Sequence, residues 1–365
     1  MDPGTFERVW GSQVDLEEVK SMLRGDKQKP EEGSSEFLSS GSSLLNLATS
    51  GRVEGAFAAG HYFLIVGDST SGKTWLGMSV FAEASIDSRF DDYRLIYDSG
   101  EEGALMNVER FFGERAADRI EWFEPPSETV EEFYFNVDDA LRDDRPFVYV
   151  QDSQDSLSSK AEQEGFDAAK KKTRAGKKPD GSFGDGKAKI HSSRLRKLMG
   201  PLKQKKSILI ILNQTRASFD MFASSSYSGG YALKFYATLQ LWCTVKGQIV
   251  KTVRGKKIQQ GINAKIRVKK NRQTGRDRVV EIPIYHSHGI DDVGSCVNYL
   301  VDEGVWKGGE GKCIATGLGP EFGGRIEKVV KKIEEDELEE DLRELVQRTW
   351  DEVEEACAVK RKKRY

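Results

Sequence analysis

The chain has few cysteines and no long apolar run. Its four cysteines lie far apart and form no CxxC pair, which argues against a zinc site or a disulfide framework. No stretch approaches the ~18–20 apolar residues that a membrane-spanning helix needs. The first residues also lack the pattern of a signal peptide. We therefore expect a cytoplasmic protein that does not bind a membrane.

The charge of the chain is nearly balanced overall but uneven along its length. The net charge is −3 over 365 residues, yet residues 160–206 contain fifteen Lys or Arg and five Asp or Glu. Residues 334–341 are acidic at seven of eight positions, and residues 360–364 are all basic. The basic stretch indicates a surface that binds a polyanion.

Short apolar runs alternate with helical patterns in the first two thirds of the chain. Continuous runs rich in β-branched and aromatic residues predict strands that are buried on both faces of a parallel sheet. Helical spacing between these runs indicates an α/β fold. Later in the chain, the pattern predicts a β-hairpin with strands at 263–270 and 278–284 and a turn near Thr274-Gly275. The predicted parallel strands are 62–66, 94–97, 147–150 and 208–212, with helices at 75–84 and 195–202 between or after them.

The composition divides the chain into three parts. Residues 1–36 are polar with one short amphipathic stretch, which fits either a packed helix or a flexible tail. Residues 37–290 contain the α/β pattern, and residues 291–365 form a smaller C-terminal part. Apolar residues at helical intervals from 326 to 356 predict an amphipathic helix or helix pair, which we expect to pack on its own domain in preference to a partner.

A phosphate-binding motif follows the first predicted strand. The segment from Gly67 to Thr74 is GxxxxGK[ST], between a strand and a helix as this motif requires. Its backbone N–H groups would surround phosphate, Lys73 would contact the β- and γ-phosphates of ATP, and the Thr74 hydroxyl would be a ligand of Mg²⁺. The expected nucleotide-binding residues are Gly67, Asp68, Ser69, Thr70, Ser71, Gly72, Lys73 and Thr74.

Carboxylates at the ends of two other strands complete the predicted ATPase site. Asp152 ends the run FVYVQD and would hold Mg²⁺ through water. The strand RLIYD leads into Glu101 and Glu102, either of which could orient the attacking water.

Several ordered motifs resemble the RecA recombinases, from about residue 38 to residue 306. These are LSSGSSLLNLATSG before the phosphate loop, VQDSQDSLSSKAEQEG, and ILIILNQTRASFDMFASSSYSGGYALKFYAT. The resemblance implies a RecA-like P-loop core with a mostly parallel central sheet, a short N-terminal segment and a small helix-rich C-terminal domain.

The resemblance also implies roles for individual residues. Gln214 would sense the γ-phosphate, and the loop after it would bind DNA through Arg216, Met221 and Phe222. The family's pair of basic residues that reach a neighbouring subunit's ATP falls on Lys270 and Arg272, and Phe235 falls on a position at the subunit contact.

A long basic insert at residues 168–194 departs from the bacterial RecA recombinases and is more like their phage relatives. We expect it to be a mobile loop that contacts DNA phosphates. No aromatic residue follows Glu102 where the family stacks one on adenine, so the recognition of the base stays open. The expected DNA contacts in this region are Lys170, Lys171, Lys172, Arg174, Lys177, Lys178, Lys187, Lys189 and Arg194.

The sequence thus predicts a Mg²⁺- and ATP-dependent recombinase, acting in DNA recombination and repair. It would form a helical homo-oligomeric filament on single-stranded DNA, pair it with duplex DNA, and hydrolyse ATP at subunit interfaces. Single-strand-binding and mediator proteins are further candidate partners. The alternatives are a ring helicase with the same core and a recombination regulator that turns over ATP poorly.

Overall fold

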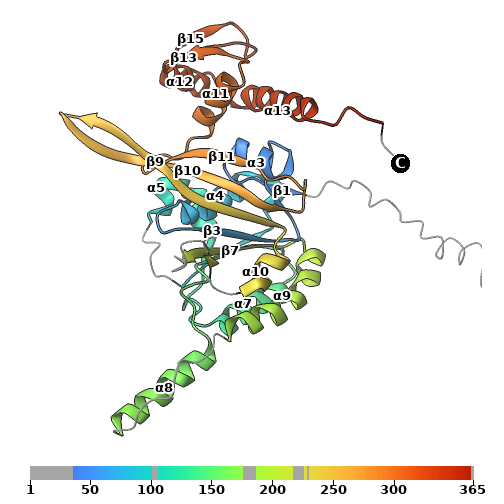
Figure 1. Ribbon diagram of the computed structural model, residues 1–365, viewed down its shortest axis with the longest axis vertical. Coiled ribbons are helices and arrows are strands. Elements are labelled where there is room, and N and C mark those ends of the chain that lie inside the picture. The colour runs from blue at the N-terminus through green and yellow to red at the C-terminus, as the bar shows by residue number, and fades with distance from the viewer. Residues whose placement is uncertain (1–35, 101–105, 176–185, 217–225, 228–229, 363–365) are drawn as a thin grey trace, which may run out of the picture. The chain divides into compact units, whose positions relative to one another are not determined.

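The computed structural model describes residues 36–100, 106–175, 186–216, 226–227 and 230–362. Residues from Phe37 onward form one compact unit built on a central β-sheet (Figure 1). None of the helices in the described ranges is both long enough and apolar enough to cross a bilayer. The strands of the central sheet are β3 (Tyr62–Gly67), β4 (Arg94–Ser99), β5 (Ile120–Trp122), β6 (Phe147–Asp152), β7 (Ile208–Arg216), β8 (Ser226–Tyr227), β9 (Leu239–Val253), β10 (Lys256–Asn271), β11 (Val279–Tyr285) and β12 (Gly289–Ile290).

The sheet is mixed and mostly parallel. Its strand order is β12-β11-β10-β9-β3-β7-β6-β4-β5, and β8 pairs with β7. Neighbouring strands run parallel from β9 through β3 to β5, and antiparallel from β9 to β12. The predicted fold class and all four predicted parallel strands are confirmed.

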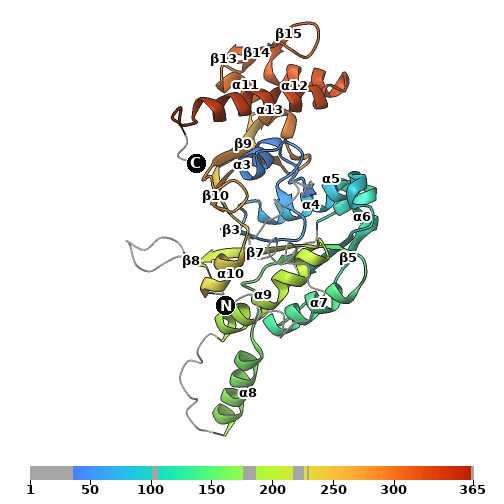
Figure 2. The same cartoon turned by 90° about the vertical axis from the view of Figure 1, so that its right-hand side faces the viewer.

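Helices cover both faces of this sheet, which explains the continuous apolar runs. Alternate residues of a strand point to opposite faces. In β3, Phe63 and Ile65 pack in one core cluster with α3 and α4, whereas Leu64 and Val66 pack in a second cluster with α7, α9 and α10 (Figure 2). The helices named here are α3 (Ser43–Ser50), α4 (Lys73–Ile86), α7 (Val130–Arg142), α9 (Lys187–Gln204) and α10 (Gly230–Tyr236).

The hairpin predicted after residue 260 exists but belongs to a longer meander. β10 pairs with β11 as expected, and it also pairs along its whole length with β9, which the sequence analysis did not predict. The outer parts of β9 and β10 are exposed on both faces, so they carry no apolar run that would mark them as strands. The remaining elements before β12 are β1 (Phe37–Leu38), β2 (Phe57–Ala58), the 3₁₀ turn Ser88–Phe90, α5 (Val108–Phe112), α6 (Glu114–Arg119) and α8 (Lys160–Arg174).

The C-terminal part contains three helices and a small antiparallel sheet. The amphipathic pattern from 326 to 356 is a helix pair that breaks around Glu337, whose φ is 55°. Val329, Ile333, Leu342 and Val346 are buried in the main core cluster, so the pair packs on its own chain, as expected. The boundary near residue 290 and the separate segment 1–36 stay predictions. The elements are α11 (Asp292–Asp302), β13 (Lys307–Gly309), β14 (Lys312–Ala315), β15 (Phe322–Arg325), α12 (Ile326–Glu335) and α13 (Glu339–Ala356).

Candidate functional site

The phosphate loop connects the carboxyl end of β3 to the start of α4. Two of its glycines are required by close packing. A β-carbon at Gly67 would overlap the carbonyl oxygen of Cys243, and one at Gly72 would lie 2.7 Å from Ile284 Cδ1. Gly72 also has a φ of +89°, which side-chain-bearing residues rarely adopt. The loop therefore lies tightly against β9 and β11, with the N-terminus of α4 at its end.

The two side chains expected to hold Mg²⁺ are in direct contact. Thr74 Oγ1 donates a hydrogen bond of 2.7 Å to Asp152 Oδ2, and the Tyr97 hydroxyl donates to the same oxygen at 2.9 Å. The largely buried Lys73 donates from Nζ to the carbonyl oxygen of Asp68 at 2.7 Å. A hydroxyl, a carboxylate and an ammonium group around a glycine-rich loop fit a magnesium–triphosphate group.

The strand β7 links the phosphate loop to the predicted second DNA loop. Gln214 lies beside Gly67 in the parallel pairing of β7 with β3. The next residue, Thr215, donates a short hydrogen bond from Oγ1 to the side chain of Asp68. The phosphate loop therefore contacts β7 one residue before its end at Arg216.

The candidate water-orienting acids, Glu101 and Glu102, lie outside the described residues. Asp98, nearby on β4, is fully buried and accepts hydrogen bonds from the Ser127 backbone N–H, the Ser127 hydroxyl and the Tyr149 hydroxyl. The Asp98 carboxylate is thus occupied by structural contacts, and Glu101 and Glu102 stay the predicted water-orienting acids.

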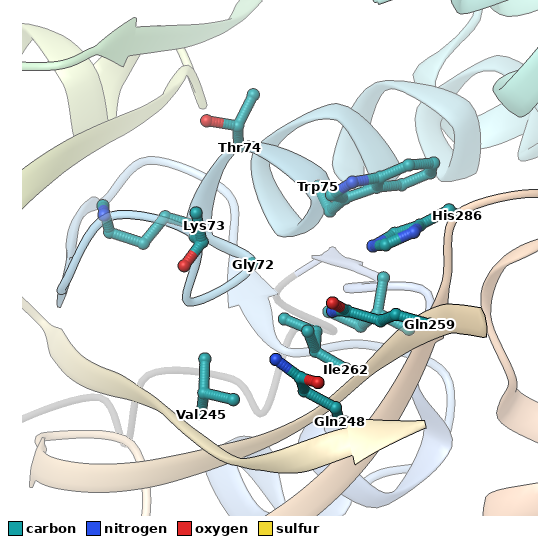
Figure 3. A pocket seen from close by; sticks show the side chains of 11 residues that line it. Gly72, Lys73, Thr74, Trp75, Val245, Gln248, Gln259, Ile262 and His286 are labelled. Atoms are coloured by element: carbon teal, nitrogen blue, oxygen red, sulfur yellow. The ribbon is translucent and has the colours of Figure 1, made fainter. Parts of the chain in front are cut away.

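A cavity of about 470 Å³ opens beside the phosphate loop (Figure 3). Trp75 at the start of α4 and His286 after β11 lie near each other on one side, with Gln248, Gln259 and Ile262 opposite. The rings of Phe111 and Phe112 pack against the Trp75 indole, each with its centroid 5.2 Å away. Sequence reasoning missed Trp75, although it directly follows the phosphate motif. His286, which lies in the turn after β11, also lines this cavity.

The basic insert is helical where the structure describes it, which corrects the expected loop. Lys170, Lys171, Lys172 and Arg174 lie in the last turns of α8, and Lys187, Lys189 and Arg194 lie in α9. Lysine and alanine are good helix formers, and a Ser159–Glu162 capping box starts α8.

The expected DNA contacts of this region differ in exposure. Lys189 is exposed, whereas Lys187 is largely buried with its Nζ 3.3 Å from Glu162 Oε2. Arg194 lies over the Phe135 ring, 5.4 Å from its centroid. Lys177, Lys178, Met221 and Phe222 lie outside the described residues.

The two basic residues expected to act on a neighbouring subunit contact the end of α10 in their own chain. Lys270 Nζ donates to the carbonyl oxygens of Lys234 and Phe235 at 2.6 and 2.8 Å, and Arg272 Nη2 donates to the latter at 2.8 Å. Burial, with repulsion from Arg272 and Lys234, lowers the pKa of Lys270 to about 8. Phe235 is 47% exposed, and the Arg272 guanidinium lies 5.7 Å from the centroid of its ring.

Comparisons with known proteins agree with this geometry. A sequence model of the RecA N-terminal domain matches residues 148–291, from β6 to β12. The chain is 26% identical to RecA of Thioalkalivibrio sulfidiphilus over 323 residues, covering 81% of this chain and 84% of that protein. It is 28% identical to RecA of Rhodospirillum rubrum over 288 residues, covering 74% and 69%. The match to chromosomal RecA of Lactococcus lactis, at 35% identity over 134 residues, spans 35% of each chain.

The range of the family model includes Asp152 at the end of β6, Gln214 and Thr215 in β7, and the basic segment of β10. The two long alignments cover most of this chain at low identity. The chain is therefore similar to RecA proteins over most of its length.

Proposed function

We propose that the chain is an ATP-dependent DNA recombinase that forms a helical filament on single-stranded DNA and catalyses homologous pairing and strand exchange. The observation that carries this proposal is the contact between Thr74 and Asp152 beside Gly67 and Gln214. This arrangement places the expected magnesium–triphosphate site next to β7, the strand that leads into the segment expected to bind DNA.

Each part of the site has a role in hydrolysis. Bound Mg²⁺ would neutralise charge on the β- and γ-phosphates of ATP. Lys73 would move from the Asp68 carbonyl to the phosphates, while Thr74 holds the ion directly and Asp152 holds it through water. Glu101 or Glu102 would orient the water for attack in line with the leaving oxygen.

The remaining part of the site would come from a second copy of the chain. Lys270 and Arg272 are held together on the last carbonyls of α10, next to the exposed Phe235. In a filament they would stabilise the charge that develops on a neighbouring subunit's γ-phosphate. Gln214 would report the presence of that phosphate to the DNA segment, since an amide can donate to a phosphate oxygen and release it after hydrolysis.

We also propose that the cavity between Trp75, His286 and the β9–β10 strands takes the base of ATP. It borders the phosphate loop, and flat ring systems provide the stacking surface that a purine needs. The rings of Trp75 and His286 would then take the place of the aromatic residue that is lacking after Glu102.

The decisive experiment measures strand exchange between a labelled oligonucleotide and homologous duplex DNA. We expect pairing that needs ATP, persists with a non-hydrolysable analogue, and depends on homology. Lys73→Ala should lower the ATPase rate by about 10²–10³-fold and abolish pairing, because the variant lacks the buried charge that is aimed at the phosphates. The exposed Lys328 on α12 gives the matched control, Lys328→Ala, which should behave as the parent protein does.

Two other outcomes would contradict the proposal. Separation of a forked duplex that requires hydrolysis and ignores homology would identify a ring helicase. Negligible ATPase stimulation by single-stranded DNA, with DNA binding intact, would identify a regulator of recombination.

A further inference from the structure

The outer part of the β9–β10 hairpin, residues 244–260, forms an arm whose end, residues 250–259, extends beyond the other strands of the sheet (Figure 1). The next strand, β11, pairs with β10 only from Gly261 onward, so in the described part of the chain residues 256–259 pair with β9 alone. All arm residues are exposed except Ile249 and Gln260, which are partly buried. The arm therefore adds little to the core, and its long exposed form requires another explanation.

The arm carries charge of one sign. It contains five Lys or Arg and no Asp or Glu. Lys246, near the base, pairs with Glu281 at 2.7 Å. The other four cations have no acidic partner among the described residues, and they are Lys251, Arg254, Lys256 and Lys257.

These cations lie on both faces of the arm. Residues directly opposite each other in an antiparallel pair share a face, and successive pairs alternate. Lys256 is opposite Val253, Lys257 opposite Thr252, and Lys251 opposite Ile258. Lys256 and Lys251 thus share one face while Lys257 lies on the other, and each cation is beside a β-branched side chain.

The turn at the tip adds a fourth cation in an unfavourable conformation. Arg254 and Gly255 form a two-residue turn with φ angles of 49° and 77°. Such a turn favours Asn-Gly or Asp-Gly, because an ordinary side chain is strained at positive φ. An arginine at this position costs stability and places a positive charge at the end of the arm.

We propose that this arm enters a groove of duplex DNA, with its cations on the phosphates of the two flanking strands. A two-stranded ribbon fits the major groove, which is about 12 Å wide. The part of the arm that only β9 and β10 form, residues 250–259, is about 14 Å long at ~3.4 Å per residue, which exceeds the ~8.5 Å depth of the major groove. The inference extends the proposed function, because it gives the recombinase a separate element for holding the duplex partner.

A nucleic acid fits this surface better than an acidic protein surface does. Cations on both faces match the two walls of phosphate that border a groove, whereas a protein surface would meet one face. The chain's own acidic block, residues 334–341 of a second copy, is the other occupant of suitable charge. Two of its acids already have partners, since Glu335 pairs with Lys331 and Asp336 with Lys332.

The test compares duplex binding by two variants from which the same amount of charge is removed. The arm variant combines Lys251→Gln, Arg254→Asn, Lys256→Gln and Lys257→Gln; asparagine at 254 suits the turn, so the hairpin should be retained. The control variant combines Arg142→Gln, Arg145→Gln, Lys203→Gln and Lys205→Gln, around α7 and α9. Fluorescence anisotropy would give the Kd of a labelled duplex with a non-hydrolysable ATP analogue, across a range of salt concentrations.

We expect the arm variant to bind duplex DNA roughly thirtyfold more weakly at 0.15 M salt if two of its cations bind phosphate, since each counterion released contributes about fivefold. The slope of its salt dependence should fall by about one unit for each phosphate that the variant can no longer neutralise, whereas the control should keep the parent slope. The ATPase rate on single-stranded DNA should not change, because the four arm residues lie outside the nucleotide site.

Three results would overturn the inference. These are equal duplex affinity of the arm variant and the parent, absence of duplex binding by the parent, and loss of self-association in the arm variant with duplex binding intact. The last would assign the arm to a second copy of the chain. The ATPase stimulation of the parent protein by single-stranded DNA tells these failures apart from a failure of the proposed function. If the proposed function is wrong, the parent shows no such stimulation; if only the inference about the arm is wrong, the stimulation is present.

Discussion

At the scale of single residues, Trp75 stands out, because it is the first residue after the phosphate motif and lines a cavity while it packs against the core. Its indole contacts the rings of Phe111 and Phe112. It also lies near His286 (Figure 3). A ring fixed in this way provides a stacking surface without the loss of side-chain entropy that a free aromatic residue would incur.

Trp75→Ala should therefore weaken ATP binding by about fivefold to 150-fold, because stacking between a base and an aromatic ring is worth ~1–3 kcal/mol. Trp75→Phe should retain most of the affinity. Calorimetry with ATP and with inorganic triphosphate separates the base from the phosphates, and only ATP binding should change. The two histidines form a matched pair, since His286→Ala should weaken ATP binding and His288→Ala should not. Equal losses for ATP and triphosphate would show that Trp75 supports the phosphate loop and not the base.

At the scale of secondary structure, α8 depends on local interactions more than the other long helices of the core do. Gly165 is its only buried residue, and Phe166 is 68% exposed. The helix is stabilised instead by the Ser159–Glu162 capping box and by basic residues in its last turn, which oppose the negative end of the helix dipole. In α7, by contrast, the capping residue Thr129 precedes a face that is buried in the core.

Removing each cap should have a different effect. Ser159→Ala should cost about 1 kcal/mol of local helix stability, so that amide exchange in α8 rises about fivefold while the global unfolding midpoint stays unchanged. Thr129→Ala removes the same kind of cap from α7 and should lower the global midpoint, because that helix unfolds with the core. Hydrogen exchange and thermal unfolding of both variants provide the comparison. A global loss of stability in Ser159→Ala would contradict an independent α8.

At the scale of the whole molecule, three polar contacts join the C-terminal helices to elements near the start of the described chain and to the sheet. Asp292 on α11 accepts hydrogen bonds from Ser43 N–H and Oγ at 2.6 and 2.8 Å, and Arg343 Nε of α13 lies 3.5 Å away. The side chain of Gln347 bonds to the backbone of Gly51 and Val53. Arg278 of the hairpin pairs with Glu354 at 2.7 Å.

Asp292 accepts two hydrogen bonds from Ser43 and also lies beside Arg343, so its removal should be the most costly of the three. Asp292→Ala should lower the free energy of unfolding by about 2–4 kcal/mol, because it leaves the first N–H of α3 and the Arg343 guanidinium without their partner. Asp351→Ala removes an exposed acid of α13 and should change stability by less than about 0.5 kcal/mol. Urea unfolding measures both, and a double-mutant cycle with Ser43→Ala should be non-additive. An additive cycle would show that the Asp292–Ser43 contact contributes no coupling energy.

The sequence by itself determined the features that depend on local order along the chain. Strands buried on both faces give continuous apolar runs, and the phosphate loop needs its glycines, Lys73 and Thr74 in consecutive positions, so both were predictable. Asp152 was predictable because it ends an apolar strand, whereas Gln214 was named by the resemblance to RecA recombinases. The parallel sheet brings the carboxyl ends of both strands to the same edge.

Only the tertiary structure decided the features that depend on residues far apart in sequence. Trp75 and His286 lie near each other because β11 lies next to the phosphate loop in the folded chain. No local sequence pattern predicts that contact. The β9–β10 arm gave no apolar signal, since both of its faces are exposed and pairing between its strands defines it. The basic insert was read as a loop because charge and glycine marked it, whereas capping by Ser159 and the helix propensity of its lysines made its described parts helical. Hydrophobic periodicity depends on burial. It therefore cannot predict elements that are exposed to solvent on both faces, or sites assembled from several elements.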